Sequence, residues 1–295
     1  MEGLIVIFSF FLKDRYLYKY LSILISEMNY TLKIKIADYV FQCIIEDFNL
    51  YKILRNKYRA FSDKRRADVV MHFSLKHDNR RYYKLKDDFK KHKIDFNVNS
   101  KDMCRIIHNN FYGFENFLSS VIYYWLLHKK VIVLHASGVI RNRKAYVFCG
   151  KPGAGKTTIA KLLGSQIMND NEILIKKRNS KFVAYSSPFK RRGIKPKNIN
   201  APLAGIFFLK RRNFKKITKL GKDQAFKHII INHYIPKFSY QYKNDVENLF
   251  KMCIGITGSA PCYELSFKLD KKIWRDINAL TKLHNEKEGF SFRNS

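Results

Sequence analysis

The stretch VIVLHASGVIRNRKAYVFCGKPGAGKTTIAKLLG, which runs from Val131 to Gly164, decides the fold of this chain. Its apolar start, Val131 to Leu134, is typical of a buried strand. The letters RNRK at 141–144 are typical of a hairpin turn, and the run from Ala145 to Cys149 predicts the returning strand. After a glycine-rich loop, the residues from Thr157 to Leu163 predict a helix. The stretch therefore predicts a two-stranded hairpin that delivers a loop to the start of a helix.

The loop in this stretch fits a phosphate-binding pattern. Residues Gly150 to Thr157 satisfy GxxxxGK[ST], with a strand before and a helix after, which is the context that the pattern requires. Glycines adopt backbone angles that other residues avoid, so successive amide hydrogens can converge on phosphate oxygens at the positive end of the helix. Lys156, expected to face solvent until phosphate arrives, is predicted to reach the β- and γ-phosphates, and the Thr157 hydroxyl to complete a magnesium shell.

The residues predicted to hold the triphosphate are Gly150, Pro152, Gly153, Ala154, Gly155, Lys156, Thr157 and Thr158. The loop thus predicts binding of a nucleoside triphosphate together with Mg²⁺, and the alternative is an accidental glycine-rich turn.

The N-terminal part of the chain has the pattern of a separate sheet. Alternation at the start of Thr31 to Ile45 predicts a half-buried strand. Short runs at Asp68–Leu75, Arg80–Leu85 and Lys93–Val98, separated by polar turns, predict an antiparallel sheet. From Phe111 to His128 apolar residues recur at spacings of three and four, which predicts an amphipathic helix.

Several segments together resemble a known family. They are LHASGV, VFCGKPGAGKTTIAKLL, IMNDNEIL, AYSSPF and APLAGIFFLKR, with a weaker echo in CYELSFKL. The stretch Val131 to Lys268 resembles the HPr serine kinase/phosphorylase-like group, whose P-loop lies on a fold related to ATP-dependent phosphoenolpyruvate carboxykinase. The resemblance implies an α/β domain with a mixed sheet. Pattern changes along the chain place this domain at 111–295 and indicate a smaller α+β region of unknown role at 1–110, which carries no such resemblance.

The same resemblance implies the catalytic side chains. His135 occupies the position of a histidine near the transferred phosphoryl group, and Asp170 that of a carboxylate that binds magnesium and accepts the proton of the acceptor hydroxyl. Asn171 is a departure, because the family carries a second acid there and an amide cannot take a proton. The alternatives are a core histidine at 135 and a simple turn residue at 170.

Basic residues surround these motifs. Lys190, Arg191 and Arg192 either form a solvated loop or line the acceptor or triphosphate side of the site. Leu209 to Lys216 is expected to be the end of a strand and a turn, and Trp274 to anchor the last helix.

The charge of the whole chain is high. It has 57 Lys and Arg against 24 Asp and Glu, a formal net charge of +33. That excess favours nucleic acid or an anionic surface, yet the basic residues are scattered and no nucleic-acid motif is present. A compositional bias that enriches Lys, Asn, Ile, Tyr and Phe together is the preferred explanation of the charge, so no specific nucleic-acid partner is expected.

Cysteine spacing and hydropathy set the remaining bounds. The five cysteines show neither a CxxC pair nor a zinc spacing, which predicts a reduced, cytoplasmic setting. No apolar run reaches the roughly 20 residues that span a bilayer, so no transmembrane segment is expected.

The combined pattern predicts an ATP-dependent phosphotransferase that moves the γ-phosphate to a hydroxyl, with Ser in a peptide or protein as the acceptor. Two other classes stay open: a non-catalytic ATP-binding sensor that recruits a partner protein, which Asn171 favours, and a nucleic-acid-binding NTPase, which rests on charge. The sequence leaves homo-oligomer formation open.

Overall fold

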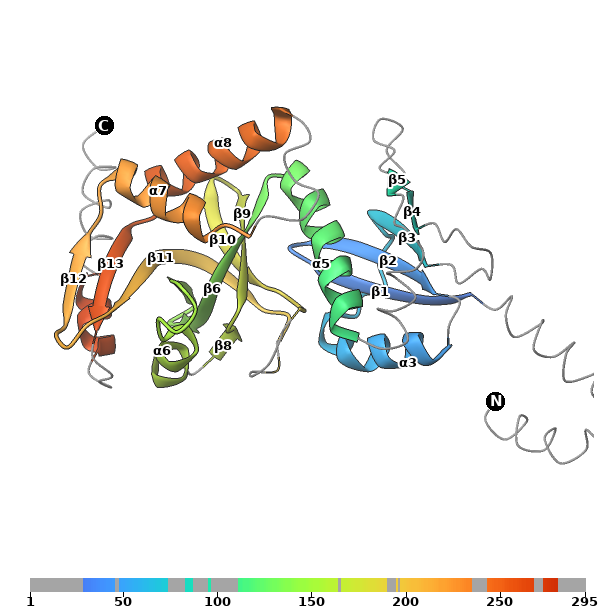
Figure 1. The fold of residues 1–295 in the computed structure, drawn as a ribbon, viewed down its shortest axis with the longest axis horizontal. Coiled ribbons are helices and arrows are strands. Elements are labelled where there is room, and N and C mark those ends of the chain that lie inside the picture. Colours follow the sequence, from blue (N-terminus) through green and yellow to red (C-terminus); the bar gives the residue numbers. More distant parts are fainter. Residues whose placement is uncertain are drawn as a thin grey trace, which may run out of the picture. The chain divides into compact units, whose positions relative to one another are not determined.

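The structure, a computed structural model, describes residues 29–45, 48–73, 83–86, 95–96, 111–163, 166–189, 195, 197–234, 243–267 and 273–280. The chain divides into two compact units (Figure 1). The smaller contains the described residues before Asn110 except Ile36–Asp38, and the larger contains Ile36–Asp38 and everything from Asn110 onward.

The smaller unit is built on a five-stranded sheet in the order β1-β2-β3-β4-β5. Its strands are β1 (Tyr30–Ile36), β2 (Tyr39–Ile45), β3 (Val69–Phe73), β4 (Tyr83–Lys86) and β5 (Asp95–Phe96). Helix α3 (Phe48–Lys57) and a 3₁₀ turn, Arg59–Phe61, lie between β2 and β3 in the chain. Ile34, Phe41 and Leu54 are fully buried in this unit.

Two expectations for this sheet are wrong. The run Thr31–Ile45 is two strands rather than one, because Ala37 and Asp38 take positive φ values of 49° and 75° and turn the chain back. The sheet is also not wholly antiparallel, since β2 and β3 pair in parallel. Parallel neighbours need a crossover connection, which α3 supplies and the apolar pattern did not reveal.

The larger unit has an eight-stranded sheet in the order β10-β9-β6-β7-β11-β13-β12, with β8 paired to β6. The strands are β6 (Val131–Arg141), β7 (Lys144–Cys149), β8 (Gln166–Asn169), β9 (Glu172–Arg178), β10 (Lys181–Ser186), β11 (Asn200–Arg211), β12 (Lys216–Lys219) and β13 (Cys262–Phe267). Strands β7, β11 and β13 are parallel, and the other pairings are antiparallel. The protein is thus a mixed α/β chain with a small N-terminal sheet and a larger mixed sheet.

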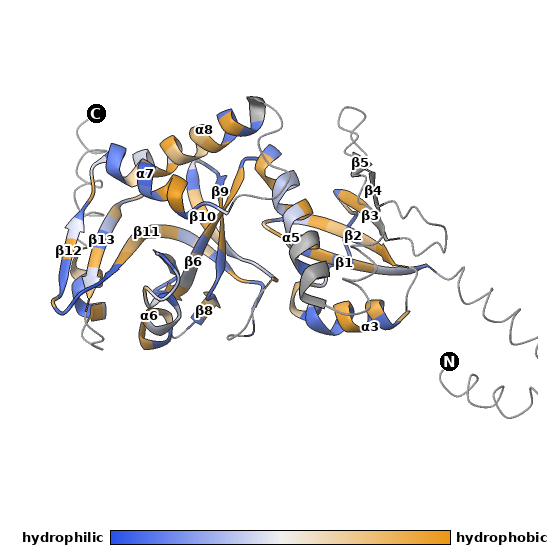
Figure 2. Ribbon diagram, viewed as in Figure 1, coloured by the Kyte–Doolittle hydropathy of each residue, from blue (hydrophilic) through white to orange (hydrophobic). Residues whose placement is uncertain are grey.

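Helices cover both faces of the larger sheet (Figure 1). On one face, α7 (Lys222–Asn232) and α8 (Lys243–Ser259) bury Ile229 and Ile256 against Leu134 and neighbouring strand residues. On the other face, α6 (Lys156–Leu163) and the helical residues 273–280 pack on an aromatic layer. That layer stacks Phe207 between Phe148 and Tyr263, with ring centroids 5.3 and 5.0 Å apart. Figure 2 shows the hydrophobic residues concentrated along the central strands, whereas β12 is hydrophilic.

The decisive stretch folds as predicted. Strands β6 and β7 form the hairpin, and its turn residues Asn142 and Arg143 take φ values of 50° and 58°. Positive φ at both turn residues matches the right-handed twist of the flanking strands, which explains why a two-residue turn closes them. Trp274 anchors the last described helix, because its ring meets Tyr146 edge-on at 4.9 Å and lies under the Arg141 guanidinium at 4.4 Å.

Helix α5 (Phe111–His128) has the predicted bounds but is not amphipathic over its second half. Every side chain from Leu118 to Leu127 is buried. Ser119 and Ser120 are buried together with the apolar side chains, so this half of the helix has no exposed polar face and is an interior helix. Among the described helices, none is long and apolar enough to cross a membrane.

Candidate functional site

The glycine loop, residues Gly150–Gly155, lies at the carboxyl end of β7, beside the ends of the parallel strands β11 and β13. Ligands of α/β folds commonly bind outside the carboxyl ends of parallel strands, which here are β7, β11 and β13. The loop then enters α6 at Lys156, whose carbonyl accepts a hydrogen bond of 2.8 Å from the Ser137 hydroxyl on β6. This bond ties the first turn of the helix to the sheet.

Two glycines of the loop occupy backbone regions that other residues avoid. Gly153 has φ of 80° and Gly155 has φ of 95°. A Cβ at Gly155 would lie 2.9 Å from Cζ of Phe267, whereas one at Gly153 would meet nothing within 4 Å. Gly155 is therefore needed for both conformation and close packing, and Gly153 for conformation alone.

Lys156 does not face solvent as expected. Its side chain is 8% exposed, and its Nζ donates hydrogen bonds to the carbonyls of Gly150 at 2.7 Å and Lys151 at 3.2 Å. Burial lowers the pKa of this ammonium group below its usual value. These acceptors are carbonyls of its own loop, so the lysine folds over the loop instead of extending into water.

Thr157 and Asp170 lie side by side, while the metal-binding role that the motif and the family resemblance imply for them stays a prediction. The Thr157 hydroxyl donates to Oδ2 of Asp170 at 3.4 Å, across the gap between α6 and the end of β8. Asp170 is buried, with 8% of its surface exposed. Hydroxyl and carboxylate oxygens are the hard ligands that Mg²⁺ prefers.

These two side chains fit a magnesium ion that takes few protein ligands. Within the described part of the chain, no three or more His, Cys, Asp and Glu side chains gather into a metal-binding group. Magnesium usually keeps several waters and is bound through one or two carboxylates and substrate phosphates, so the Thr157 and Asp170 oxygens fit such an ion, and the site stays a prediction.

His135 lies on the same edge of the sheet as the loop. It is half-buried on β6 and lines a pocket of about 660 Å³ together with the glycine loop, the end of β11 and the end of α7. Its Cα pairs with that of Glu172 in the β6–β9 ladder, so the two side chains project from the same face. The structure thus brings His135 next to the loop, while its role stays a prediction.

His233 is a pocket residue that the sequence reasoning missed. It is 8% exposed, and its Nδ1 lies 3.0 Å from the Val133 carbonyl, which can only accept, so the neutral ring carries its proton on Nδ1. Burial lowers the pKa of His233 to about 4. The residue joins the end of α7 to β6, and nothing in the local sequence signals this pairing.

The turn that carries Asp170 is joined to distant segments by hydrogen bonds to their backbone groups. Asn169 is 1% exposed; its Oδ1 accepts from the amides of Asn171 and Glu172, and its Nδ2 donates to the carbonyls of Ser187 and Phe189. The Ala136 amide on β6 donates to the Asn171 carbonyl at 3.1 Å. The turn is therefore fixed from both sides.

Glu172 is a second residue without a predicted role. Its carboxylate is buried, 7% exposed, and accepts hydrogen bonds from the Tyr123 and Ser187 hydroxyls and from Asn171 Nδ2. Burial, together with the nearby Glu172 carboxylate, raises the pKa of Tyr123 well above its usual value. The network joins α5 to the β8–β9 turn and the segment after β10.

The remaining predicted site residues are exposed, lie in a turn, or fall outside the described residues. Pro152 and Thr158 are exposed, and Ala154 closes a turn by donating its amide to the Lys151 carbonyl. The basic run at 190–192, comprising Lys190, Arg191 and Arg192, lies outside the described residues.

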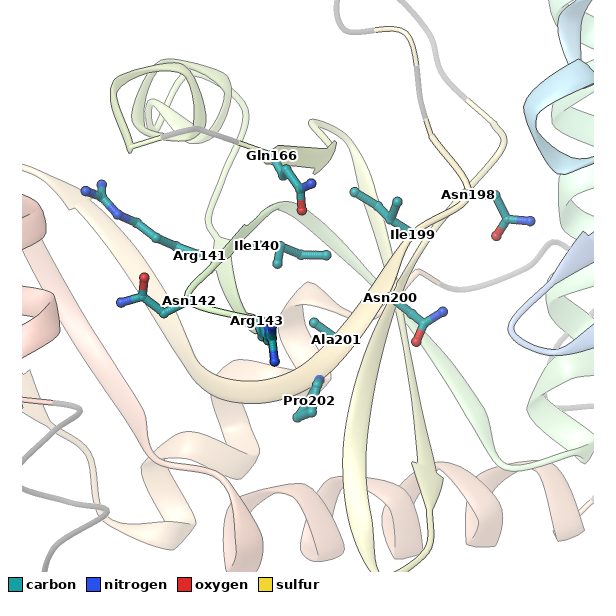
Figure 3. A pocket seen from close by; sticks show the side chains of 10 residues that line it. All are labelled: Ile140, Arg141, Asn142, Arg143, Gln166, Asn198, Ile199, Asn200, Ala201 and Pro202. Carbon is teal, nitrogen blue, oxygen red and sulfur yellow. The ribbon is translucent and has the colours of Figure 1, made fainter.

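A second pocket, of about 530 Å³, lies around the hairpin turn, at the opposite end of β7 from the glycine loop (Figure 3). Polar and basic side chains line it, among them Asn142, Arg143 and Gln166. Arg141 extends away from the other lining side chains (Figure 3), because its guanidinium stacks on Trp274 and donates to the Leu163 carbonyl. No predicted site residue lines this pocket.

No protein-family model matches the sequence, and the search of curated proteins found no match. Among solved structures, the chain is similar to the HPr(Ser) kinase/phosphatase from Coxiella burnetii, with 12% identity and a TM-score of 0.32. The match covers 53% of this chain and 98% of that chain. It is a weak resemblance of fold over about half of this protein.

Proposed function

We propose that the larger unit binds ATP with Mg²⁺ through the glycine loop and transfers the γ-phosphate to a hydroxyl acceptor, a Ser in a peptide or protein. The observation that carries the proposal is the loop at the carboxyl end of β7, with Thr157 and Asp170 3.4 Å apart beside it. The segments from Val131 to Lys268 that resemble the HPr serine kinase group support the same activity.

In this proposal each residue has one task. Loop amides and the Lys156 ammonium hold the phosphates, which requires Lys156 to leave its two carbonyl partners when phosphate arrives. Thr157 and Asp170 hold magnesium, which neutralises charge on the phosphate oxygens. The acceptor oxygen forms a bond to the γ-phosphorus, the bond from that phosphorus to the leaving oxygen of ADP breaks, and the hydroxyl proton passes to the Asp170 carboxylate.

Binding is tested with Lys156→Ala. We expect the affinity for a non-hydrolysable ATP analogue with Mg²⁺, measured by calorimetric titration, to fall at least about tenfold, because a charge-assisted phosphate contact is lost. Lys161→Ala is the matched control, since Lys161 is exposed in the last turn of the same helix. Unchanged affinity in a folded Lys156→Ala protein refutes the assignment of the loop.

Transfer is tested with Asp170→Asn. We expect the rate of labelled γ-phosphate transfer to Ser peptides to fall by about 10² or more, with nucleotide binding affected less, because the amide cannot accept the proton. Asp223→Asn, at an exposed carboxylate in the first turn of α7, is the control. A variant with wild-type turnover contradicts the assignment.

A non-catalytic ATP sensor is the second candidate, and Asn171 at the position of the family's second acid favours it. Tight binding of ATP and Mg²⁺ by the wild-type protein, with no transfer to peptides or water above background, selects the sensor over the phosphotransferase.

A further inference from the structure

The residue after Asp170 is held in one orientation by its neighbour. Asn171 Nδ2 donates a hydrogen bond of 3.2 Å to Oε1 of Glu172. A planar amide has its oxygen and nitrogen on opposite branches, so the bond through Nδ2 directs Oδ1 of Asn171 away from Glu172. Asn171 is half-buried, on the turn that also carries Asp170.

Glu172 is itself held in place. Its Oε2 accepts from the Tyr123 hydroxyl and, at 3.2 Å, from the Ser187 hydroxyl, and those two hydroxyls lie 2.6 Å apart. With Oε2 engaged by these hydroxyl groups and Oε1 by the amide of Asn171, both oxygens of the carboxylate are held as acceptors. A buried carboxylate is stabilised by several such donors, so it can in turn fix the group that donates to it.

We propose that Glu172 is a positioning residue that fixes the amide of Asn171 with its Oδ1 presented to the magnesium held by Thr157 and Asp170. The proposal rests on the proposed function. The Asn171 side chain then offers its carbonyl-type oxygen as a ligand to the ion or as an acceptor to a water bound to the ion. Glu172 sets the orientation of that side chain. Position 171 has no carboxylate. The carboxylate of the next residue, Glu172, acts by orienting the Asn171 amide.

This pairing reverses a prediction that follows from the family resemblance alone. If Asn171 were a decayed acid, Asn171→Asp would leave activity equal or higher. In the structure the new carboxylate would lie beside Oε1 of Glu172 in place of a donor, and two neighbouring carboxylates repel one another. Asn171→Asp therefore costs stability and does not raise activity.

The experiment is a double-mutant cycle with Asn171→Asp, Glu172→Gln and the two combined. In Glu172→Gln the new amide keeps its oxygen towards Tyr123 and Ser187 and turns its NH₂ towards Asn171, whose own amide must flip and present Nδ2 to the metal. We expect a melting temperature close to that of the wild type and a fall of about tenfold in the apparent Mg²⁺ affinity during binding of the ATP analogue.

The single variant Asn171→Asp is expected to lose stability, and the combined variant is expected to recover it. Asn171→Asp alone lowers the melting temperature in the absence of ligand by about 3 °C or more. In the combined variant the amide and the carboxylate exchange places, so the hydrogen bond returns with its direction reversed and an oxygen again faces the metal. Both the melting temperature and the Mg²⁺ affinity then recover towards wild-type values. Glu247→Gln, which removes an exposed carboxylate on α8, is the control for lost charge.

The outcomes separate this proposal from the proposed function. Additive effects on melting temperature in the combined variant overturn the pairing, and an unchanged Mg²⁺ dependence in Glu172→Gln overturns the positioning role. If the wild type shows no Mg²⁺-dependent nucleotide binding, the proposed function and the metal part of this proposal both fail. The ligand-free stability cycle still reports on the Asn171–Glu172 pair in that case.

Discussion

At the scale of single residues, the conformation of the glycine loop depends on a contact with a residue outside its sequence pattern. The pattern predicts glycine at 155 for its backbone angle, but the structure adds the ring of Phe267, 2.9 Å from a Cβ placed there. We expect Gly155→Ala to lower the free energy of unfolding by about 2 kcal/mol or more, since strain and overpacking act together. Urea unfolding at constant slope measures this loss.

Gly153→Ala is the matched control, because it has positive φ with nothing within 4 Å of the added methyl group. Its cost should be about 1 kcal/mol from the backbone alone. Adding Phe267→Leu to Gly155→Ala should recover part of the larger loss. Equal losses for the two glycine variants contradict the role assigned to Phe267.

At the scale of elements, the end of α7 is attached to the sheet through a histidine that must be neutral. The bridge between Leu134 and His233 and the bond from the Tyr234 amide to the Val133 carbonyl join the segment to β6. Burial lowers the pKa of His233 to about 4, whereas the exposed ring titrates near 6.5. Between these values the unfolded chain binds more protons than the folded one, so stability is full above pH 6.5 and falls as the pH drops towards 4.

This linkage is tested with His233→Asn. The amide NH₂ takes the place of Nδ1 and still donates to the Val133 carbonyl, but it does not titrate. We expect the stability difference between wild type and variant to shift by up to about 3 kcal/mol between pH 6.5 and 4, measured by chemical unfolding at several pH values. The carboxylates titrate in both proteins and cancel in the difference. A difference that is flat across this range contradicts the assignment.

Local sequence patterns predict the helices and turns whose formation depends on neighbouring residues in the chain. The hairpin at 141–144 and the helices that begin at Phe111 and Lys156 follow from turn residues and apolar spacing. The parallel pairing of β2 with β3 depends on the crossover through α3, whose apolar residues were not recognised as a helix. Pairing across the chain is decided by packing, which local spacing does not encode.

The same division applies to the candidate site. The loop and the nearness of Thr157 to Asp170 were predictable, because a motif and a family resemblance specify positions along the chain. The partners of Glu172 were not, since Tyr123 and Ser187 are 49 and 15 residues away in sequence. The prediction that Lys156 faces solvent is wrong for a similar reason. Its acceptors are carbonyls of the preceding loop, and their orientation depends on the folded backbone.

At the scale of the whole molecule, the question is what a net charge of +33 does. Basic groups attract any polyanion, so weak binding to nucleic acid is expected whatever the function, and it should weaken steeply as salt rises through counterion release. Some of these basic groups already form ion pairs or stacking contacts within the fold. Lys210, Lys215 and Lys251 pair with carboxylates, and Arg141 stacks on Trp274.

We therefore predict that duplex and single-stranded nucleic acids bind weakly and without sequence preference at about 150 mM salt, by fluorescence anisotropy across a salt series. Lys156→Ala should leave that binding unchanged while it weakens binding of the ATP analogue, because nucleic-acid binding by scattered charge does not depend on one buried lysine at the start of α6. Lys161→Ala serves again as the control. Saturable sub-micromolar binding with a preferred sequence or structure would rank a nucleic-acid-dependent NTPase above the phosphotransferase. Loss of nucleic-acid binding in Lys156→Ala alone would place both ligands at the same loop.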